Sequence, residues 1–226
     1  MKPVSITLVL FSALTLSSCT TVYTPTEVNV PMFKEINEFA AGATYGTSGA
    51  GLQLGYSITN NIAIIGSGSW MNVRDDNGRD YQRYGELGAG YFRSLGKKNS
   101  SGVEIYLGTG FGESSSYDND FNAEEKGKYY KIFLQPDVSY SIGWIDISIA
   151  MRIVFLKYTS YSYLPTTENS PYLPSAFGFE PAFTFRLGPP NFKFKYQAGF
   201  SALTENEDKP FGRSGAIASL GLMLLF

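Results

Sequence analysis

The chain has 226 residues, a length that suits one all-β domain. Its 18 basic and 20 acidic residues nearly balance, so the composition gives no sign of a nucleic-acid partner. Histidine is absent, which excludes catalytic sites that use this side chain to transfer protons near neutral pH.

Residues 1–18 have the pattern of an export signal. Lys2 precedes the apolar run "VSITLVLFSALTL", which is shorter than the roughly 20 apolar residues of a membrane-spanning helix. The run ends in "LSSC", which resembles the lipobox of bacterial lipoproteins. That resemblance implies that Cys19, the only cysteine, becomes the lipidated N-terminus. The alternative is a cysteine in an unlipidated secretion signal, and both interpretations predict export.

Residues 19–37 contain turn formers and two prolines but no sustained period. We therefore expect a flexible periplasmic tether that leads to the first strand. Two threonines, rather than acidic residues, follow Cys19, and this favours an anchor on the periplasmic side.

From residue 38 to the end, apolar and polar residues alternate in ten segments, and no stretch has a helical period. The segments cover residues 38–47, 50–58, 62–71, 81–93, 102–112, 128–142, 145–155, 176–187, 191–202 and 213–226. Short to moderate connections near residues 60, 97, 143 and 189 alternate with mostly longer ones near 76, 119, 166 and 207. This asymmetry is typical of membrane barrels. The pattern predicts an all-β fold, a closed antiparallel up-and-down transmembrane barrel of about ten strands, over residues 38–226.

The stretch "IDISIAMRIVF", residues 145–155, raises the question of which face points outward. A soluble sandwich also alternates, with its apolar face inward. Here the polar faces are rich in small residues with a few charges, as expected for the interior of a narrow barrel. We therefore predict that the apolar rows face lipid and that an ion-pair network with some water fills the interior. Its members are Glu38, Glu86, Glu104, Lys131, Asp137, Asp146, Arg152, Glu180, Arg186, Lys193 and Lys195.

Two prolines, Pro136 and Pro181, fall within predicted strands. Proline cannot donate a hydrogen bond to a strand ladder, and a closed barrel has no free edge to accommodate it. We expect a bulge or a locally broken hydrogen bond at each.

The chain ends in "LGLMLLF", with Leu220, Leu222, Leu224 and Phe226 at alternate positions. This ending resembles the assembly signal of bacterial outer-membrane barrels. Over residues 38–226 the chain resembles the small outer-membrane β-barrel proteins of Gram-negative bacteria, the OmpA-like group. The resemblance implies an outer-membrane location, with membrane lipid and the barrel-assembly machinery as partners.

No enzymatic activity, cofactor or metal site is predicted. The acidic loops "DDNGRD" and "YDNDFNAEE" lack the ligand spacing of a calcium loop. The stretch 158–175 is rich in tyrosine and proline, which favours a contact surface for an external ligand or a host surface. Its candidate binding residues are Tyr158, Tyr161, Tyr163 and Tyr172.

The expected function is therefore non-enzymatic, either structural in the envelope or in adhesion and recognition through external loops. One alternative is a narrow diffusion or transport pore. Another is a soluble lipid-anchored barrel that binds an apolar ligand, with its apolar rows facing inward.

Overall fold

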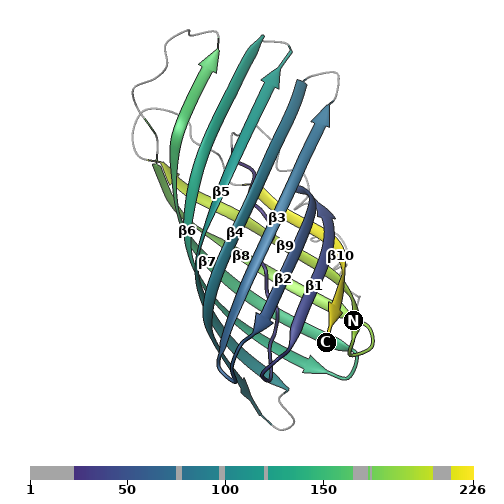
Figure 1. The fold of residues 1–226 in the computed structure, drawn as a ribbon. Coiled ribbons are helices and arrows are strands. Elements are labelled where there is room, and N and C mark those ends of the chain that lie inside the picture. The colour runs from purple at the N-terminus through teal and green to yellow at the C-terminus, as the bar shows by residue number, and fades with distance from the viewer. Residues whose placement is uncertain are drawn as a thin grey trace, which may run out of the picture.

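The computed structural model describes residues 23–74, 78–96, 100–119, 122–164, 173, 175–205 and 215–226. Within these ranges the chain forms ten antiparallel strands that close into one barrel (Figure 1). Each strand pairs with the next along the chain, and the last pairs with the first. The predicted fold class, a closed up-and-down barrel of ten strands, is confirmed. The described ranges hold no helix with the length and apolar character of a membrane span.

The strands are β1 (Phe39–Gly46), β2 (Gly49–Ser57), β3 (Ile62–Arg74), β4 (Gly78–Leu95), β5 (Ser101–Asp118), β6 (Ala123–Ile142), β7 (Ile145–Leu164), β8 (Ser175–Leu187), β9 (Phe192–Glu205) and β10 (Gly215–Leu225). The turns after β2, β4, β6 and β8 lie at one end of the barrel, here called the turn end, and the opposite end is the loop end. Strands β4 to β7 have 18–20 residues, whereas β1 and β2 have 8 and 9. The wall is therefore taller on the side of β4 to β7 (Figure 1).

The apolar rows face outward. In β7, Ile149 and Met151 are 58% and 48% exposed on the outer wall, whereas Asp146 and Arg152 are 6% and 0% exposed inside. Successive side chains of a strand point to opposite faces, so the alternation of the sequence becomes an apolar exterior and a polar interior. The predicted orientation is confirmed, and the alternative that requires inward-facing apolar rows is wrong.

Strand β7 is longer than the sequence indicated. It continues to residue 164, through the first part of the stretch expected to be a loop. Tyr158 is fully buried opposite Tyr129 of β6, and a register shift follows between Lys128 and Tyr129. The expected loop boundary at residue 158 was wrong because the alternation continues past Phe155 with tyrosines and serines in place of aliphatic residues.

Both in-strand prolines interrupt the ladder, as predicted. The pairing of β6 with β7 lapses at Gln135 and Pro136, and that of β8 with β9 lapses at Glu180 and Pro181. Pairing resumes in the same register on each side, so the irregularity is a local loss of hydrogen bonds and not a bulge. The missing proline N–H accounts for it.

The C-terminal residue closes the barrel at the turn end. Phe226 donates its amide to the carbonyl of Phe39 at 2.9 Å, and the Phe39 amide returns a bond of 2.8 Å. Leu220, Leu222 and Leu224 point outward along β10, where they are 43–66% exposed. The predicted assembly signal thus lies on the outer wall at the seam between β10 and β1.

The segment before β1 is not a free tether. Residues 23–33 are buried inside the barrel, with only Thr24 partly accessible. The expectation of a periplasmic tether over residues 19–37 was therefore wrong for this part of the chain. Cys19 and the predicted signal, residues 1–18, lie outside the described residues.

Candidate functional site: the filled lumen

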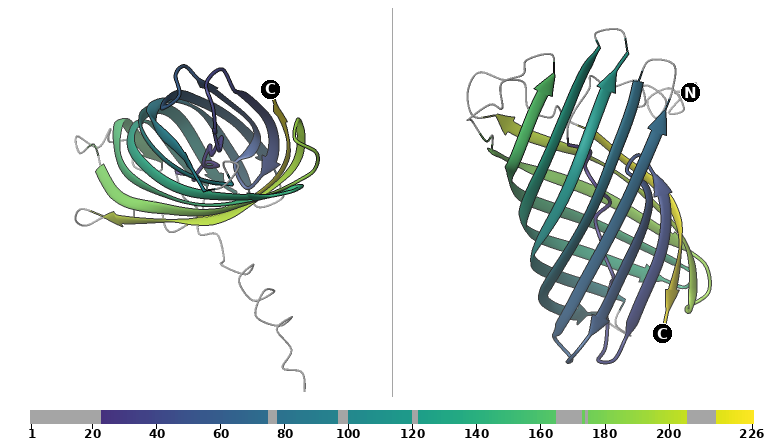
Figure 2. Two further views of the ribbon diagram at one scale, coloured as in Figure 1. Left: turned by 90° about the horizontal axis from the view of Figure 1, so that it is seen from below. Right: turned by 45° about the horizontal axis from the view of Figure 1, so that its top comes forward.

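The N-terminal segment of residues 23–34, here called the lumen segment, runs down the barrel interior toward the turn end. Near the loop end of β4, Gln82 contacts Thr24, whereas Ser94 at the other end of β4 donates to the Lys34 carbonyl at 2.7 Å. In Figure 2 the dark purple trace of this segment crosses the space that the strands enclose. The lumen is therefore occupied by the chain's own N-terminal residues.

Wall glutamines hold the backbone of the lumen segment. Gln82 accepts a hydrogen bond from the Thr24 amide and donates one to the Thr24 carbonyl, both at 3.0 Å. Gln197 makes the same two bonds with Val28, at 2.8 and 2.9 Å. These side-chain amides supply the hydrogen bonds that a neighbouring strand would supply in a sheet. They satisfy peptide groups that would otherwise be buried without partners.

Charged residues hold the segment nearer the turn end. Glu104 accepts hydrogen bonds from the amides of Met32 and Phe33, at 3.2 and 2.8 Å. The guanidinium of Arg186 donates to the Pro31 carbonyl at 3.0 Å. Two ionisable side chains of the wall therefore hold the backbone of the segment over residues 31–33.

Small residues of the wall make room for the segment. Val28, Val30 and Met32 pack in one apolar cluster with Ala150 of β7 and Ala182 of β8. On the opposite wall a Cβ at Gly55 would lie 2.9 Å from Cζ of Phe33. The small interior residues therefore accommodate a peptide as well as the wall's own side chains.

Four charges form a compact cluster in the loop-end half of the lumen. Arg152 donates to both carboxylate oxygens of Glu86, at 3.2 and 3.0 Å. Lys131 Nζ lies 3.7 Å from a carboxylate oxygen of Glu86 and also from one of Glu180. Arg152 is 4.0 Å from Glu180. Two acids and two bases therefore neutralise each other out of contact with solvent, which buried charges require.

Neutral hydroxyls complete the cluster and link it to the lumen segment. Ser67 and Tyr84 each donate to Glu86 at 2.7 Å. The hydroxyl of Tyr23, the first described residue, donates to Glu180 at 2.6 Å. The segment and the charge cluster thus form one hydrogen-bonded unit.

The structure buries ten of the eleven interior charges predicted from the sequence, and Glu38 is half-buried at the turn end. Outside the four-charge cluster, their contacts are Lys193–Asp146 at 3.2 Å, Gln135–Asp137 at 3.3 Å, Lys195–Gln53 at 2.6 Å and the Lys34 amide with Glu38 at 2.6 Å. The predicted ion pairing is thus present, but Lys195 bonds a neutral amide, and Glu104 and Arg186 bond the lumen segment.

The lumen segment and the glutamines that bind it were not predicted from the sequence. One signal was present, because Val28, Val30 and Met32 repeat at the period of a strand. Pro25, which precedes this short run, and Pro31, which lies within it, obscured the signal. No local pattern marks Gln82 or Gln197 as binding residues, because glutamine is also ordinary inside a polar barrel.

A cluster of tyrosines lies above the charges, toward the loop end. The Tyr129 ring is 5.5 Å from Tyr23, 6.2 Å from Tyr84 and 5.5 Å from Tyr158, and Tyr161 packs 6.0 Å from Tyr158. Ring spacings of this size are typical of packed aromatic pairs. Two of the four candidate binding residues, Tyr158 and Tyr161, therefore belong to the packing of the lumen, so their assignment to a binding loop was wrong.

The side chains of the other two candidates lie outside the described part of the structure. Tyr163 belongs to β7, and Tyr172 lies outside the described residues. A ligand surface built on Tyr172 and the long loops stays a prediction.

Comparison with known proteins adds no relative. No protein-family model and no curated protein matches this chain. In the described part of the chain, no group of three or more acidic, cysteine or histidine residues is arranged to hold a metal ion.

Proposed function

We propose that this chain is a bacterial outer-membrane β-barrel, lipidated at Cys19, that serves in envelope structure or in recognition and keeps its lumen closed with its own N-terminal segment. One observation carries the proposal: a band of apolar side chains faces outward around the barrel, while ten charged side chains of the strands are buried in its interior. Water-soluble monomers rarely expose apolar patches beyond a few hundred Å², whereas a membrane barrel needs such a band. The outward leucines of β10 also suit recognition by the barrel-assembly machinery.

The filled lumen favours this role over a pore. Four wall side chains bind the backbone of the lumen segment: Gln82, Gln197, Glu104 and Arg186. A continuous water path through the barrel would therefore require displacement of the lumen segment. A barrel of ten strands is also only slightly wider than a barrel of eight strands, whose interior is filled by side chains alone. We therefore expect negligible conductance from the intact protein.

The proposal includes no catalytic activity. The chain has no histidine, and the carboxylates of Glu86 and Glu180 are neutralised by Lys131 and Arg152. Recognition is assigned to the long connections at the loop end, including Tyr172, with an external ligand or a host surface as partner.

The periplasmic exit of the N-terminus favoured by the sequence is not part of this proposal. Tyr23 already lies in the loop-end half of the lumen, beside Glu180 and Lys131.

A charge on the outer wall tests the membrane location. Ile149→Lys places an ammonium near the middle of the apolar band, where a lysine costs about 2–4 kcal/mol in a membrane barrel. The same change on a wall that faces water leaves the free energy of unfolding within about 0.5 kcal/mol. Unfolding by urea after reconstitution into vesicles, followed by heat-dependent migration on gels, measures the difference. Ile149→Leu is the control, and equal stability of the two variants would defeat the membrane proposal.

Lipidation has a separate test. Cells that express the chain are fed a radiolabelled fatty acid, and the labelled protein is compared with Cys19→Ala. We expect the label only in the unchanged chain, because Cys19 is the only cysteine available for the thioether. Equal incorporation in the two proteins would contradict lipidation at this residue without affecting the barrel assignment.

A further inference from the structure

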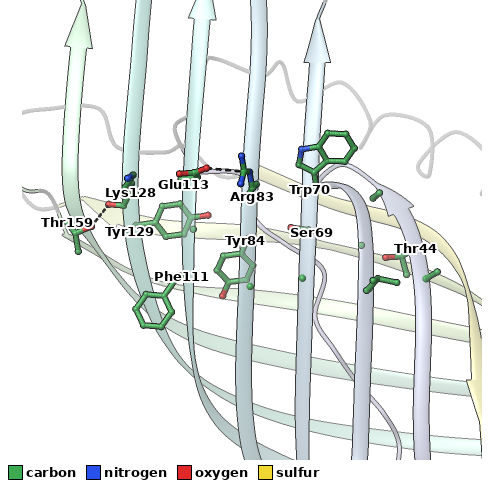
Figure 3. Close-up of a pocket in the computed structure, with 17 residues that line it drawn as sticks. Thr44, Ser69, Trp70, Arg83, Tyr84, Phe111, Glu113, Lys128, Tyr129 and Thr159 are labelled. Atoms are coloured by element: carbon green, nitrogen blue, oxygen red, sulfur yellow. Dashed lines mark hydrogen bonds and ion pairs between the residues drawn. The ribbon is translucent and has the colours of Figure 1, made fainter.

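Four side chains lie side by side across the outer wall, above the apolar band and toward the loop end. The strand register pairs Trp70 with Arg83, Arg83 with Glu113 and Glu113 with Lys128. These side chains project from β3, β4, β5 and β6 at one level (Figure 3). A bulky indole and three charged groups therefore share one row.

The row directly below contains a hollow. Gly68 of β3 pairs with Gly85 of β4, and Gly85 pairs with Phe111 of β5. Two adjacent glycines on the outer face leave this row without side chains between Leu52 and Phe111. The resulting cavity of about 970 Å³ is lined by these residues and by Trp70, and Arg83 and Lys128 stand at its upper edge (Figure 3).

The row directly above is polar. Tyr81 of β4 pairs with Ser115 of β5, Ser115 with Lys126 of β6, and Lys126 with Ser162 of β7. These four residues line a second cavity of about 450 Å³, which shares Glu113 and Lys128 with the hollow below. An apolar hollow therefore continues upward into a cavity of hydroxyls and amines.

The charges at this junction favour an anionic group. Glu113 is partly neutralised by Arg83 at 3.5 Å, and Glu124 by Lys126 at 2.7 Å. Among the described residues, Lys128 has no acidic side chain within ion-pair distance. On a chain with a net charge of −2, these strands therefore present an excess of positive charge just above the apolar band.

We propose that this outer-wall site binds one lipid of the surrounding leaflet, a lipid with a phosphate-bearing headgroup. An acyl chain lies over Gly68 and Gly85 between the two aromatic rings, and the hydroxyl row receives the polar headgroup. The phosphate sits at the upper edge of the hollow, within reach of Arg83 and Lys128 on either side of Glu113, whose carboxylate is already bound by Arg83 and Tyr81. Lys and Arg near a membrane surface attract anionic lipid, by about fivefold in affinity for each residue. This inference rests on the proposed membrane location.

Trp70 provides a direct reporter, because the chain has only one other tryptophan, Trp144 in the turn after β6. The full chain carrying Trp144→Phe is reconstituted into phosphatidylcholine vesicles that contain a small fraction of acyl-brominated lipid, which quenches nearby indole fluorescence. The quencher is brominated phosphatidic acid in one series and brominated phosphatidylcholine in the other. We expect the phosphatidic acid to quench Trp70 at least about fivefold more effectively, and the preference to weaken at high salt.

Charge variants distinguish a specific lipid site from a general electrostatic attraction of anionic lipid to the protein. Arg83→Gln with Lys128→Gln is expected to remove the preference for phosphatidic acid. The matched control, Lys34→Gln with Arg93→Gln, removes the same charges near the turn end and is expected to keep the preference. Equal quenching by the two lipids in the unchanged background, or equal loss in both double variants, would overturn the proposed site.

The same experiment distinguishes failure of the site from failure of the membrane proposal. In vesicles made wholly of brominated phosphatidylcholine, a membrane barrel shows strong quenching of Trp70, because the exposed indole faces the bilayer border. Strong quenching there without headgroup preference rejects only the lipid site. Absence of quenching in all vesicles rejects the membrane location and the site together.

Discussion

Arg152→Met is expected to lower the free energy of unfolding by about 3–5 kcal/mol, the usual cost of removing one partner from a buried ion pair. The side chain is fully buried and donates to both oxygens of Glu86. Without it, Lys131 alone faces the carboxylates of Glu86 and Glu180, so one negative charge remains uncompensated in a space from which water is excluded. Methionine keeps much of the volume, so the loss reports charge more than packing.

A second substitution tests this explanation. Adding Glu86→Gln to Arg152→Met restores a neutral cluster, because Lys131 then faces only Glu180. We expect the double variant to recover at least half of the lost stability, and a double-mutant cycle isolates the coupling between the two residues. Arg93→Met, an exposed arginine near the turn end, is the control and is expected to change stability by less than about 0.5 kcal/mol.

Urea titration in vesicles, with the folded fraction measured by heat-dependent gel migration, provides the free energies. A loss below about 1 kcal/mol for Arg152→Met would show that the cluster is open to water or ions. A double variant no more stable than the single one would show that the arginine acts mainly through packing, for example on the ring of Phe133 4.5 Å away. Either result would remove the charge cluster as the main stabilising feature of the lumen.

The sequence predicted the barrel and its interior charges because both depend on one local rule. A strand has two faces, so alternation assigns each residue to the inside or the outside once the orientation is known. The small and charged residues opposite the isoleucines of β7 decided that orientation. Hence Asp146, Arg152 and eight further charges were placed inside without any knowledge of the strand register.

The contacts inside the lumen could not be predicted in this way. Glu86 and Arg152 are 66 residues apart, and they meet because of the stagger of strands around a closed barrel, which alternation does not contain. The lumen segment was missed for a related reason. A run as short as Val28 to Met32 gives a weak signal, and its partners are side chains scattered over several strands.

The prediction that Tyr158 and Tyr161 belong to a binding loop was wrong for a different reason. Tyrosine and serine suit a binding loop and also suit the inner wall of a barrel above the membrane. Only the pairing of β7 with β6 shows that Tyr158 faces Tyr129 in the interior. Composition therefore indicated the presence of an aromatic surface but not the side of the wall on which it lies.

Replacing Gln82 and Gln197 with leucine is expected to free the lumen segment while leaving the barrel folded. Each glutamine bonds both the amide and the carbonyl of one segment residue, Thr24 or Val28. Leucine has a similar size but no polar group, and each buried peptide group left without a partner costs about 1–3 kcal/mol. Unlike a charge substitution, the change leaves no buried ion unpaired in the wall, so its effect concentrates on the segment.

Hydrogen exchange followed by mass spectrometry measures the result on a peptide that covers residues 23–33. In the unchanged protein we expect these amides to exchange about as slowly as those of the strands, because they are buried and bonded. In the double variant we expect exchange at least about a hundredfold faster, which corresponds to a loss of roughly 3 kcal/mol in the attachment of the segment. Conductance in planar bilayers should rise together with the exchange rate, since the segment fills the path along the barrel axis.

The control, Gln53→Leu, removes an interior glutamine that bonds Lys195 and is expected to leave the segment protected. Rapid exchange in the unchanged protein would show that residues 23–33 do not stay in the lumen. Protection that persists in the double variant would show that Glu104 and Arg186 alone are sufficient to hold the segment in place.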